Sequence, residues 1–265
     1  MVQLPYFIVV LGTAGSGKST LTSALQDHLI RNELDAATVN LDPAVVNLPY
    51  KPDIDVRDYV DARELMTRYG LGPNGALVTA IDMIAMRADE IKEEIMGLKS
   101  NYIIIDTPGQ MEVFAFRESG PITLNILLEN SKAVSLFLID AMYAIKPSNY
   151  FSALLLATST YFRIGLPQIL VLNKTDIIEE DHLERLVNYR EDPEILAEDI
   201  VNEESRNIMI WDREELYVLV EKLSMYELIP VSSTRMEGYD ELYASIQRVL
   251  AGGEDYLTEE PSPRL

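Results

Sequence analysis

The strongest chemical signal in the sequence is a glycine-rich loop that ends in a lysine and a serine. Residues 12–19 read Gly-Thr-Ala-Gly-Ser-Gly-Lys-Ser, which fits the pattern G-x-x-x-x-G-K-[ST]. Glycines let such a loop wrap closely, so that its backbone N–H groups point at nucleotide phosphates, and Lys18 reaches the β- and γ-phosphates. The Ser19 hydroxyl is a ligand for Mg²⁺. The predicted phosphate-binding residues are Gly12, Thr13, Ala14, Gly15, Ser16, Gly17, Lys18, Ser19 and Thr20.

A second motif, Asn173-Lys174-Thr175-Asp176, follows the apolar run 168–172. The Asp176 carboxylate can accept hydrogen bonds from N1–H and N2–H₂ of guanine, a pair of donors that adenine lacks. Lys174 can lie along the base, and Asn173 can tie the motif to its neighbours. The four residues also fit an Asx-type turn, but their position after the phosphate loop favours guanine. Weaker candidates for backbone contacts to the base are Ser232 and Ser233.

A third motif, residues 106–110 (Asp-Thr-Pro-Gly-Gln), follows the run 102–105. Asp106 is expected to hold Mg²⁺ directly or through water, and Gln110 to orient a water for in-line attack. Gly109 would let its N–H sense the γ-phosphate. Asp42 supplies a second carboxylate, either for metal-linked water or for the nucleophile; a turn or helix-cap residue is its structural alternative. The predicted metal-binding residues are Ser19, Asp42 and Asp106.

These motifs fall at the ends of short β-branched runs that alternate with helical patterns, which predicts an α/β fold with a mostly parallel sheet. In such sheets ligands bind beyond the carboxyl ends of the strands. The expected class is a three-layer P-loop NTPase core with a helical acidic insertion. Strands are expected at 6–11, 36–41, 102–106, 135–139, 168–172 and 228–231. Helices are expected at 19–33, 56–69, 76–98, 122–131, 149–162 and 239–251.

Charge is distributed unevenly along the 265 residues, which carry a formal net charge of −21. Residues 177–228 hold 16 acidic and 5 basic residues and are expected to form a helical insertion within a single domain, 1–251. This insertion is either a solvated surface or a partner-docking surface. Residues 252–265 have the composition of a disordered tail. The acidic surface argues against direct binding of nucleic acid or anionic membranes.

The sequence holds no cysteine and two histidines, so disulfides, thiolate zinc sites and cysteine nucleophiles are excluded. His28 and His182 lie in polar helical stretches and are expected at the surface. No run is long enough to span a bilayer, and a soluble, cytoplasmic protein is expected. The apolar residues Met111, Phe114 and Phe116 indicate either core or a partner surface that opens in another nucleotide state. Four arginines that the sequence does not rank as phosphate ligands are Arg57, Arg63, Arg117 and Arg163.

Together these motifs resemble the GPN-loop GTPases, a family of dimeric P-loop GTPases of archaea and eukaryotes. The most specific match is residues 69–77, Tyr-Gly-Leu-Gly-Pro-Asn-Gly-Ala-Leu. The resemblance also covers Leu41-Asp42-Pro43-Ala44, residues 53–58 (Asp-Ile-Asp-Val-Arg-Asp), and the motifs at 12–19, 106–110 and 173–176. It extends over about 4–250, and the acidic insertion is its least characteristic part.

The resemblance implies a homodimer in which Gly72, Pro73 and Asn74 of one protomer reach the nucleotide site of the other. Asn74 would lie near the γ-phosphate or the released phosphate and donate an amide hydrogen bond. By sequence alone, residues 72–75 favour an ordinary turn between helices. Related dimeric NTPases carry a lysine at the second loop position, whereas this chain has Thr13. Eukaryotic relatives imply a role in assembling a large complex such as RNA polymerase. The expected catalytic residues are Lys18, Asp42, Asn74 and Gln110.

Hydrolysis of GTP to GDP and phosphate, with Mg²⁺ as cofactor and a conformational change between states, is the leading functional hypothesis. A nucleotide-dependent assembly scaffold or chaperone with slow hydrolysis is the alternative. A P-loop small-molecule kinase is a third hypothesis, but such kinases usually close an arginine-rich lid over the phosphates. The only candidate lid, 177–228, is strongly acidic and would repel phosphate.

Overall fold

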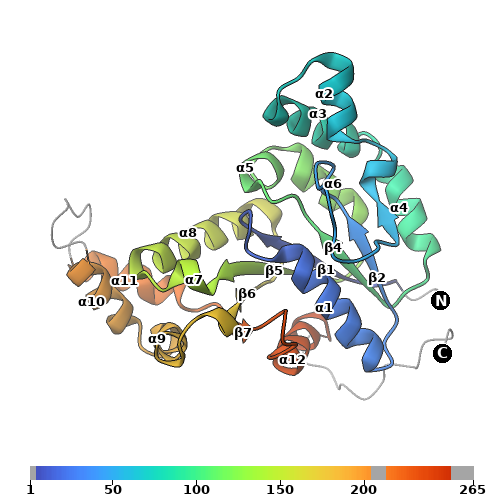
Figure 1. The fold of residues 1–265 in the computed structure, drawn as a ribbon. Coiled ribbons are helices and arrows are strands. Elements are labelled where there is room, and N and C mark those ends of the chain that lie inside the picture. The colour runs from blue at the N-terminus through green and yellow to red at the C-terminus, as the bar shows by residue number, and fades with distance from the viewer. Residues whose placement is uncertain (1–3, 204–212, 252–265) are drawn as a thin grey trace.

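One seven-stranded sheet forms the centre of the protein, and all neighbouring strands in it pair in parallel. The computed structural model describes residues 4–203 and 213–251. The strand order is β3-β2-β4-β1-β5-β6-β7, with β1 in the middle of the sheet (Figure 1). The strands are β1 Tyr6–Gly12, β2 Ala36–Asn40, β3 Ile54–Asp55, β4 Tyr102–Asp106, β5 Ala133–Asp140, β6 Gln168–Asn173 and β7 Leu228–Val231.

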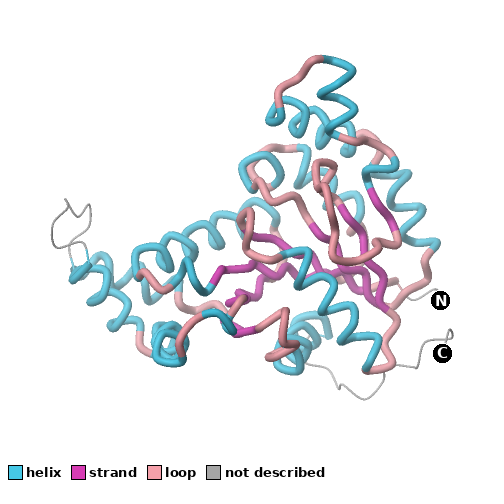
Figure 2. Tube along the Cα trace, in the orientation of Figure 1, coloured by secondary structure: helices cyan, strands magenta, loops and turns pink. Residues whose placement is uncertain are grey.

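Helices connect the strands, so that the magenta strands of Figure 2 lie between cyan helical layers. The predicted α/β class with a parallel sheet is therefore confirmed. The main helices are α1 Lys18–Arg31, α2 Ala62–Tyr69, α3 Pro73–Ala85, α4 Ala88–Gly97, α6 Ser119–Leu127, α8 Pro147–Ile164, α9 Glu180–Glu191, α10 Pro193–Glu203, α11 Arg213–Leu223 and α12 Tyr239–Ala251. Shorter pieces are the 3₁₀ turns η1 Val56–Asp58 and η2 Thr175–Ile177 and the single turns α5 Met111–Phe114 and α7 Ala141–Ala144.

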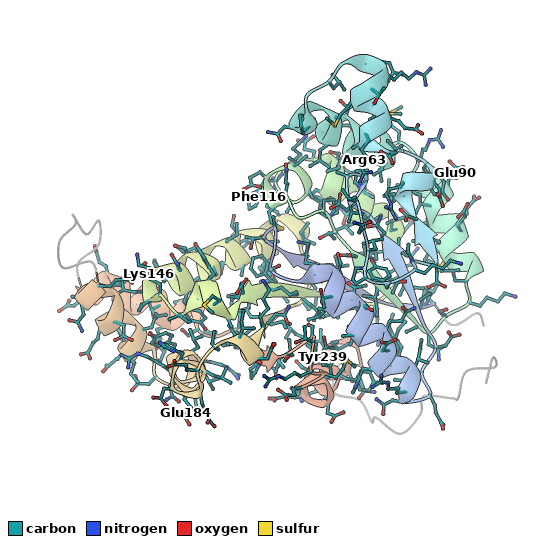
Figure 3. All side chains as sticks on the ribbon, viewed as in Figure 1. Arg63, Glu90, Phe116, Lys146, Glu184 and Tyr239 are labelled. Atoms are coloured by element: carbon teal, nitrogen blue, oxygen red, sulfur yellow. The ribbon has the colours of Figure 1, made fainter. Side chains whose placement is uncertain are left out.

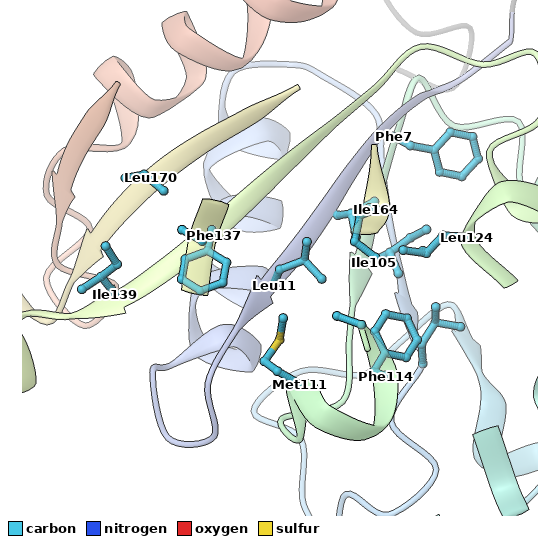
Figure 4. Close-up of a cluster of buried hydrophobic side chains, with 14 of the residues drawn as sticks. Phe7, Leu11, Ile105, Met111, Phe114, Leu124, Phe137, Ile139, Ile164 and Leu170 are labelled. Atoms are coloured by element: carbon cyan, nitrogen blue, oxygen red, sulfur yellow. The ribbon is translucent and has the colours of Figure 1, made fainter. Parts of the chain in front are cut away.

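Alternate residues of β1 pack against different helical layers, which is why this strand is apolar throughout. Phe7, Val9 and Leu11 belong to the larger core cluster, beneath α3, α6 and α8. Ile8 and Val10 face the other side and belong to the cluster that includes residues of α1 and α12. Figure 4 shows part of the larger cluster, where Met111 and Phe114 join Leu11. Met111 and Phe114 are therefore part of the core, whereas Phe116 is partly exposed.

Two of the expected helices are interrupted. The expected helix at 76–98 starts at Pro73 and is divided by a turn at Met86 and Arg87 into α3 and α4. Its buried residues Ile81, Ile84, Ile91 and Ile95 keep a helical spacing across the turn, so the pattern does not reveal the break. The expected helix at 56–69 divides into η1 and α2, and a two-residue strand, β3, precedes it unpredicted.

The acidic insertion is helical where it is described. Helices α9, α10 and α11 bury Leu186, Leu196 and Leu216 in the larger core cluster. Lys146, at the start of α8, forms an ion pair of 2.8 Å with Glu203 at the end of α10 (Figure 3). The insertion is therefore packed onto the rest of the domain. Residues 204–212 and the predicted disordered tail at 252–265 lie outside the described residues.

One surface expectation is wrong. The His28 side chain is only 12% exposed, because its ring packs against those of Tyr239 and Tyr243 on α12, with centroids 5.8 and 6.2 Å away. His182 is 43% exposed. Across 4–203 and 213–251, no helix is both long and apolar enough to cross a membrane.

Candidate nucleotide-binding site

The glycine-rich loop joins β1 to α1 at the centre of the sheet, as its sequence context predicted. Gly12 and Gly17 have φ angles of +143° and +95°, which other residues rarely adopt. A Cβ on Gly12 would also lie 2.8 Å from the Leu138 carbonyl oxygen. Helix α1 has no side-chain cap and no acidic residue in its first turn. Its first N–H groups thus remain available to an anion.

Lys18 extends back over the loop rather than into solvent. Its ammonium donates hydrogen bonds of 3.1 Å to the carbonyl oxygens of Gly12 and Thr13. Burial lowers the pKa of Lys18, and the nearby carboxylates of Asp106 and Asp42 oppose that shift. The Lys18 ammonium can offset part of the charge of a bound phosphate, whereas the two carboxylates add negative charge that suits a bound cation.

Asp106 ends β4 beside the phosphate loop and is 1% exposed. Burial raises its pKa to about 6, whereas the nearby hydroxyl groups of Ser19 and Tyr50 and the charge of Lys18 lower it. The Tyr50 hydroxyl donates to Oδ2 over 3.0 Å, whereas the buried Oδ1 has no hydrogen-bond partner. A buried carboxylate oxygen next to a serine hydroxyl fits Mg²⁺, which prefers oxygen ligands. The predicted pair Ser19 and Asp106 therefore suits this metal.

Asp42 connects the loops that follow β2 and β4. Burial raises the pKa of its carboxyl group, which accepts hydrogen bonds from the N–H groups of Ala44, Gly109 and Val45. The bond from Ala44 is 2.8 Å long, as in an Asx turn. Asp42 thus has the turn geometry that was its structural alternative, while its charge still lies close to Lys18.

A network of hydrogen bonds holds the backbone around Asp42 in place. Asn40, the last residue of β2, accepts from the Asp42 N–H over 3.0 Å and donates to Asp55 over 2.9 Å. Arg57 donates to both carboxylate oxygens of Asp55 and to the Val45 carbonyl oxygen. This arginine therefore holds the loop after β2 in place. Arg117 and Arg163 are also engaged elsewhere, with Asp82 and with the carbonyl oxygens of Ala115 and Phe116.

The base motif is bonded directly to the phosphate loop. Asn173, 1% exposed at the end of β6, donates from Nδ2 to the Ser16 carbonyl oxygen over 2.9 Å. Its Oδ1 accepts from Ser233 over 2.8 Å, and the Tyr239 hydroxyl in turn donates to Ser233. Tyr239 begins α12, below α1 in Figure 3. This is the tie between loops that the sequence suggested for Asn173.

Lys174 and Asp176, the two charged residues of the base motif, are held by different neighbours. The Lys174 ammonium donates over 2.6 Å to both the Gly15 carbonyl oxygen and Asp140, a partner absent from the sequence expectations. Ser232 and Thr234 donate to the two oxygens of Asp176, and these bonds, that from Ser232 first, lower its pKa. Ser232 and Ser233 thus use their side chains to position the base motif, a role that their sequence did not indicate.

A pocket opens beside the phosphate loop, between the end of β5 and helix α8. Loop residues Thr13, Ala14 and Gly15 form one wall of the pocket. Its other lining residues include Phe137, Ile139, Asp140, Tyr143, Ser152, Ala153 and Leu156. The sequence did not predict a role in the site for Tyr50, Asp140 and Thr234. Each of them contacts a motif that is distant in the chain, and such a contact leaves no local pattern.

Comparisons with known proteins agree with this geometry. A family model described as "Conserved hypothetical ATP binding protein" matches residues 10–252. The GPN-loop GTPase PAB0955 of Pyrococcus abyssi is 36% identical over 89% of this chain and 93% of its own length. The crystal structure of that GTPase in apo form matches with a TM-score of 0.80 and 33% identity, covering 92% of this chain and 97% of the other. The chain belongs to the GPN-loop GTPase family.

Coverage differs among the family members. GPN-loop GTPase 1 of Dictyostelium discoideum is 34% identical over 91% of this chain, which spans 61% of that protein. GPN-loop GTPase 3 of Kluyveromyces lactis is 30% identical over 97% of this chain and 96% of its own length. The family model's description mentions ATP, whereas the relatives are named GTPases and this chain carries the guanine motif with its Asp176 carboxylate.

The segment that names the family lies apart from the phosphate loop. Gly72 caps the N-terminus of α3, Pro73 is its first residue, and Asn74 follows; all three are exposed. Helices α2 and α3 pack together and project at the top of Figure 1, away from α1. Gln110, in contrast, precedes α5 directly after β4 and is also exposed. The structure thus groups the predicted nucleotide and metal residues, with Gln110 beside them and Asn74 on a separate projection.

Proposed function

We propose that this chain binds GTP with Mg²⁺ and hydrolyses it to GDP and phosphate. The observation that carries this proposal is the hydrogen bond between Asn173 and the Ser16 carbonyl oxygen, which joins the base motif directly to the phosphate loop. A nucleotide is recognised through both ends only if these two loops keep a fixed separation. The Asp176 carboxylate favours guanine because it can accept from N1–H and N2–H₂ of the base, a pair of donors that adenine lacks.

The residues act mainly by positioning and by charge. Lys18 and the loop N–H groups stabilise charge on the γ-phosphate, and Gln110 orients the attacking water. Ser19 and Asp106 would hold Mg²⁺, with Asp42 near them; the metal would neutralise charge on the phosphate oxygens. In a loose transition state positioning contributes more than proton abstraction, so orientation is the role of Gln110 and Asp42.

The proposed GTPase acts as a homodimer, in which Asn74 of each protomer completes the site of the other. This proposal is supported by family membership and by the exposure of Asn74 on a projecting helical pair. The Asn74 amide would donate to phosphate oxygens, a milder version of an arginine finger. Arg57, Arg117 and Arg163, which have other partners, would not be required for that role.

The nucleotide also acts as a switch in this proposal. The Gly109 N–H donates to Asp42. Gly109 also lies close to the phosphate loop, since a Cβ added to it would be 3.3 Å from the Ala14 Cα and 3.6 Å from the Lys18 ammonium. Binding of a γ-phosphate would compete with Asp42 for that N–H and move the segment leading to α5. We propose that this movement serves assembly of a large complex such as RNA polymerase; a scaffold with slow hydrolysis is the alternative.

Mixing two defective variants tests the site and the dimer together. Lys18→Ala should abolish turnover, and Asn74→Ala should reduce it with little loss of GTP affinity. In a mixed dimer, the Lys18→Ala subunit still supplies Asn74 to the intact Lys18 site of its partner. Random mixing should therefore restore about one quarter of the wild-type rate per protomer, because half the dimers are mixed and each has one complete site.

Two further outcomes decide between the alternatives. No recovery on mixing would place Asn74 in its own site or outside the mechanism. Gln110→Ala should slow GTP hydrolysis without changing the affinity for GTP. Asn125→Ala, at an exposed position of α6, is the control for Asn74→Ala and should hydrolyse GTP as wild type does. Transfer of phosphate to an acceptor rather than to water would indicate a kinase, and release of a client on binding without hydrolysis would indicate a scaffold.

A further inference from the structure

The loop between β2 and β3 brings one side chain to the metal carboxylate. Residues 43–53 are anchored at both ends: the Ala62 N–H donates to Pro43, and the Asp53 N–H donates to Thr38 on β2. Between these anchors Val46, Asn47, Pro49 and Lys51 are exposed. Tyr50 instead turns inward and donates its hydroxyl to Oδ2 of Asp106 over 3.0 Å.

The Tyr50 hydroxyl remains a donor at any physiological pH. An ordinary tyrosine, with a pKa of about 10, is protonated at neutral pH and can therefore donate to a carboxylate. The bond engages one oxygen of Asp106 and leaves the other, the buried Oδ1, without a hydrogen-bond partner. A carboxylate with one oxygen fixed and one free is prepared to receive a cation or a water bound to it.

We propose that Tyr50 is a positioning residue for Mg²⁺: it holds Asp106 in the orientation that presents Oδ1 to the metal. The inference rests on the proposed function, since it concerns the same nucleotide site. Carboxylates that bind metals are usually oriented by a second hydrogen-bond partner, and loss of that partner typically costs 10–100-fold in metal affinity. Tyr50 also links the order of the loop at 43–53 to occupancy of the metal site, 56 residues away in the sequence.

Tyr50→Phe tests this role because it removes only the hydroxyl. We expect the Mg²⁺ concentration that half-saturates a fluorescent GDP complex to rise roughly 10–100-fold. Affinity for the same GDP analogue in EDTA should change little, a difference that general loss of structure would not produce. Tyr161→Phe on α8, where the ring is exposed at 37%, is the matched control and should behave as wild type.

The outcomes separate this inference from the proposed function. If wild type binds GDP with Mg²⁺-dependent affinity and Tyr50→Phe shows the same or tighter Mg²⁺ dependence, the positioning role is wrong and the GTPase proposal survives. If wild type does not bind guanine nucleotides, the proposed function itself fails. If Tyr50→Phe does not fold, hydrogen exchange of the wild-type protein provides the test. Backbone amides of residues 44–53 should be more protected with GDP and Mg²⁺ than with GDP in EDTA. Equal protection in the two conditions would overturn the positioning role.

Discussion

Removing the Asn173 side chain is the most direct test of how the two nucleotide motifs are joined. Asn173→Ala deletes the donor to the Ser16 carbonyl oxygen and the acceptor for Ser233, both within a buried site. Leaving a buried polar group without its partner costs about 1–3 kcal/mol, so two such groups cost about 2–6 kcal/mol of unfolding free energy. Water entering the space left by the side chain would keep the loss near the lower limit.

Ser233→Ala provides the comparison, since it removes one of these bonds and leaves the link to Ser16. It also removes the acceptor of the buried Tyr239 hydroxyl, so two groups lose a partner and the expected cost is likewise about 2–6 kcal/mol. The two changes share a bond, so the double variant should lose less than the sum of the single losses. The assay is urea unfolding of the nucleotide-free protein, followed by titration with a fluorescent GTP analogue.

The binding data distinguish a tie between loops from simple core packing. Asn173→Ala should weaken GTP binding well beyond Ser233→Ala, because only the former separates the base motif from the phosphate loop. A variant that loses less than about 1 kcal/mol of stability and binds GTP normally would refute this reasoning. The exposed Asn125→Ala is the control for both measurements.

Two other predictions concern base recognition and pH. Asp176→Asn should weaken GTP binding by about 1.5–3 kcal/mol, roughly 10–150-fold. It should also improve binding of xanthosine triphosphate, because the new amide can donate to the carbonyl at position 2 of xanthine. Competition binding measures the ratio of the two affinities, and an unchanged preference for GTP would contradict the role of Asp176. Burial lowers the pKa of His28 below its ordinary 6.5, so the unfolded chain binds a proton more readily and wild type should lose stability relative to His28→Gln as pH falls through 6.5. Thermal unfolding from pH 8 to 5.5 measures this difference, and parallel curves would show that His28 does not titrate differently on folding.

Local pattern was sufficient for much of the fold. Six of the seven strands of the described sheet fall on predicted runs, most of which are near-continuous Ile, Val and Leu, as expected for strands covered on both faces. The two-residue β3 is too short to give such a pattern. The sequence did not predict the turn between α3 and α4, because the buried isoleucines of both helices keep a single helical spacing across it. The break between the two helices is seen only in the folded structure.

The sequence by itself determined the nucleotide motifs, because each directly follows a strand and parallel strands end at the same edge of the sheet. It did not indicate the contact of Tyr50 with Asp106 or that of Asp140 with Lys174. It pointed to Ser232 and Ser233 only for backbone contacts to the base, not for the side-chain bonds that hold Asp176 and Asn173. Those contacts join loops 34–60 residues apart in the chain. The spacing of residues along the chain does not predict which distant side chains will pair. The orientations and pKa values of the site side chains therefore depend on how the tertiary structure packs these loops together.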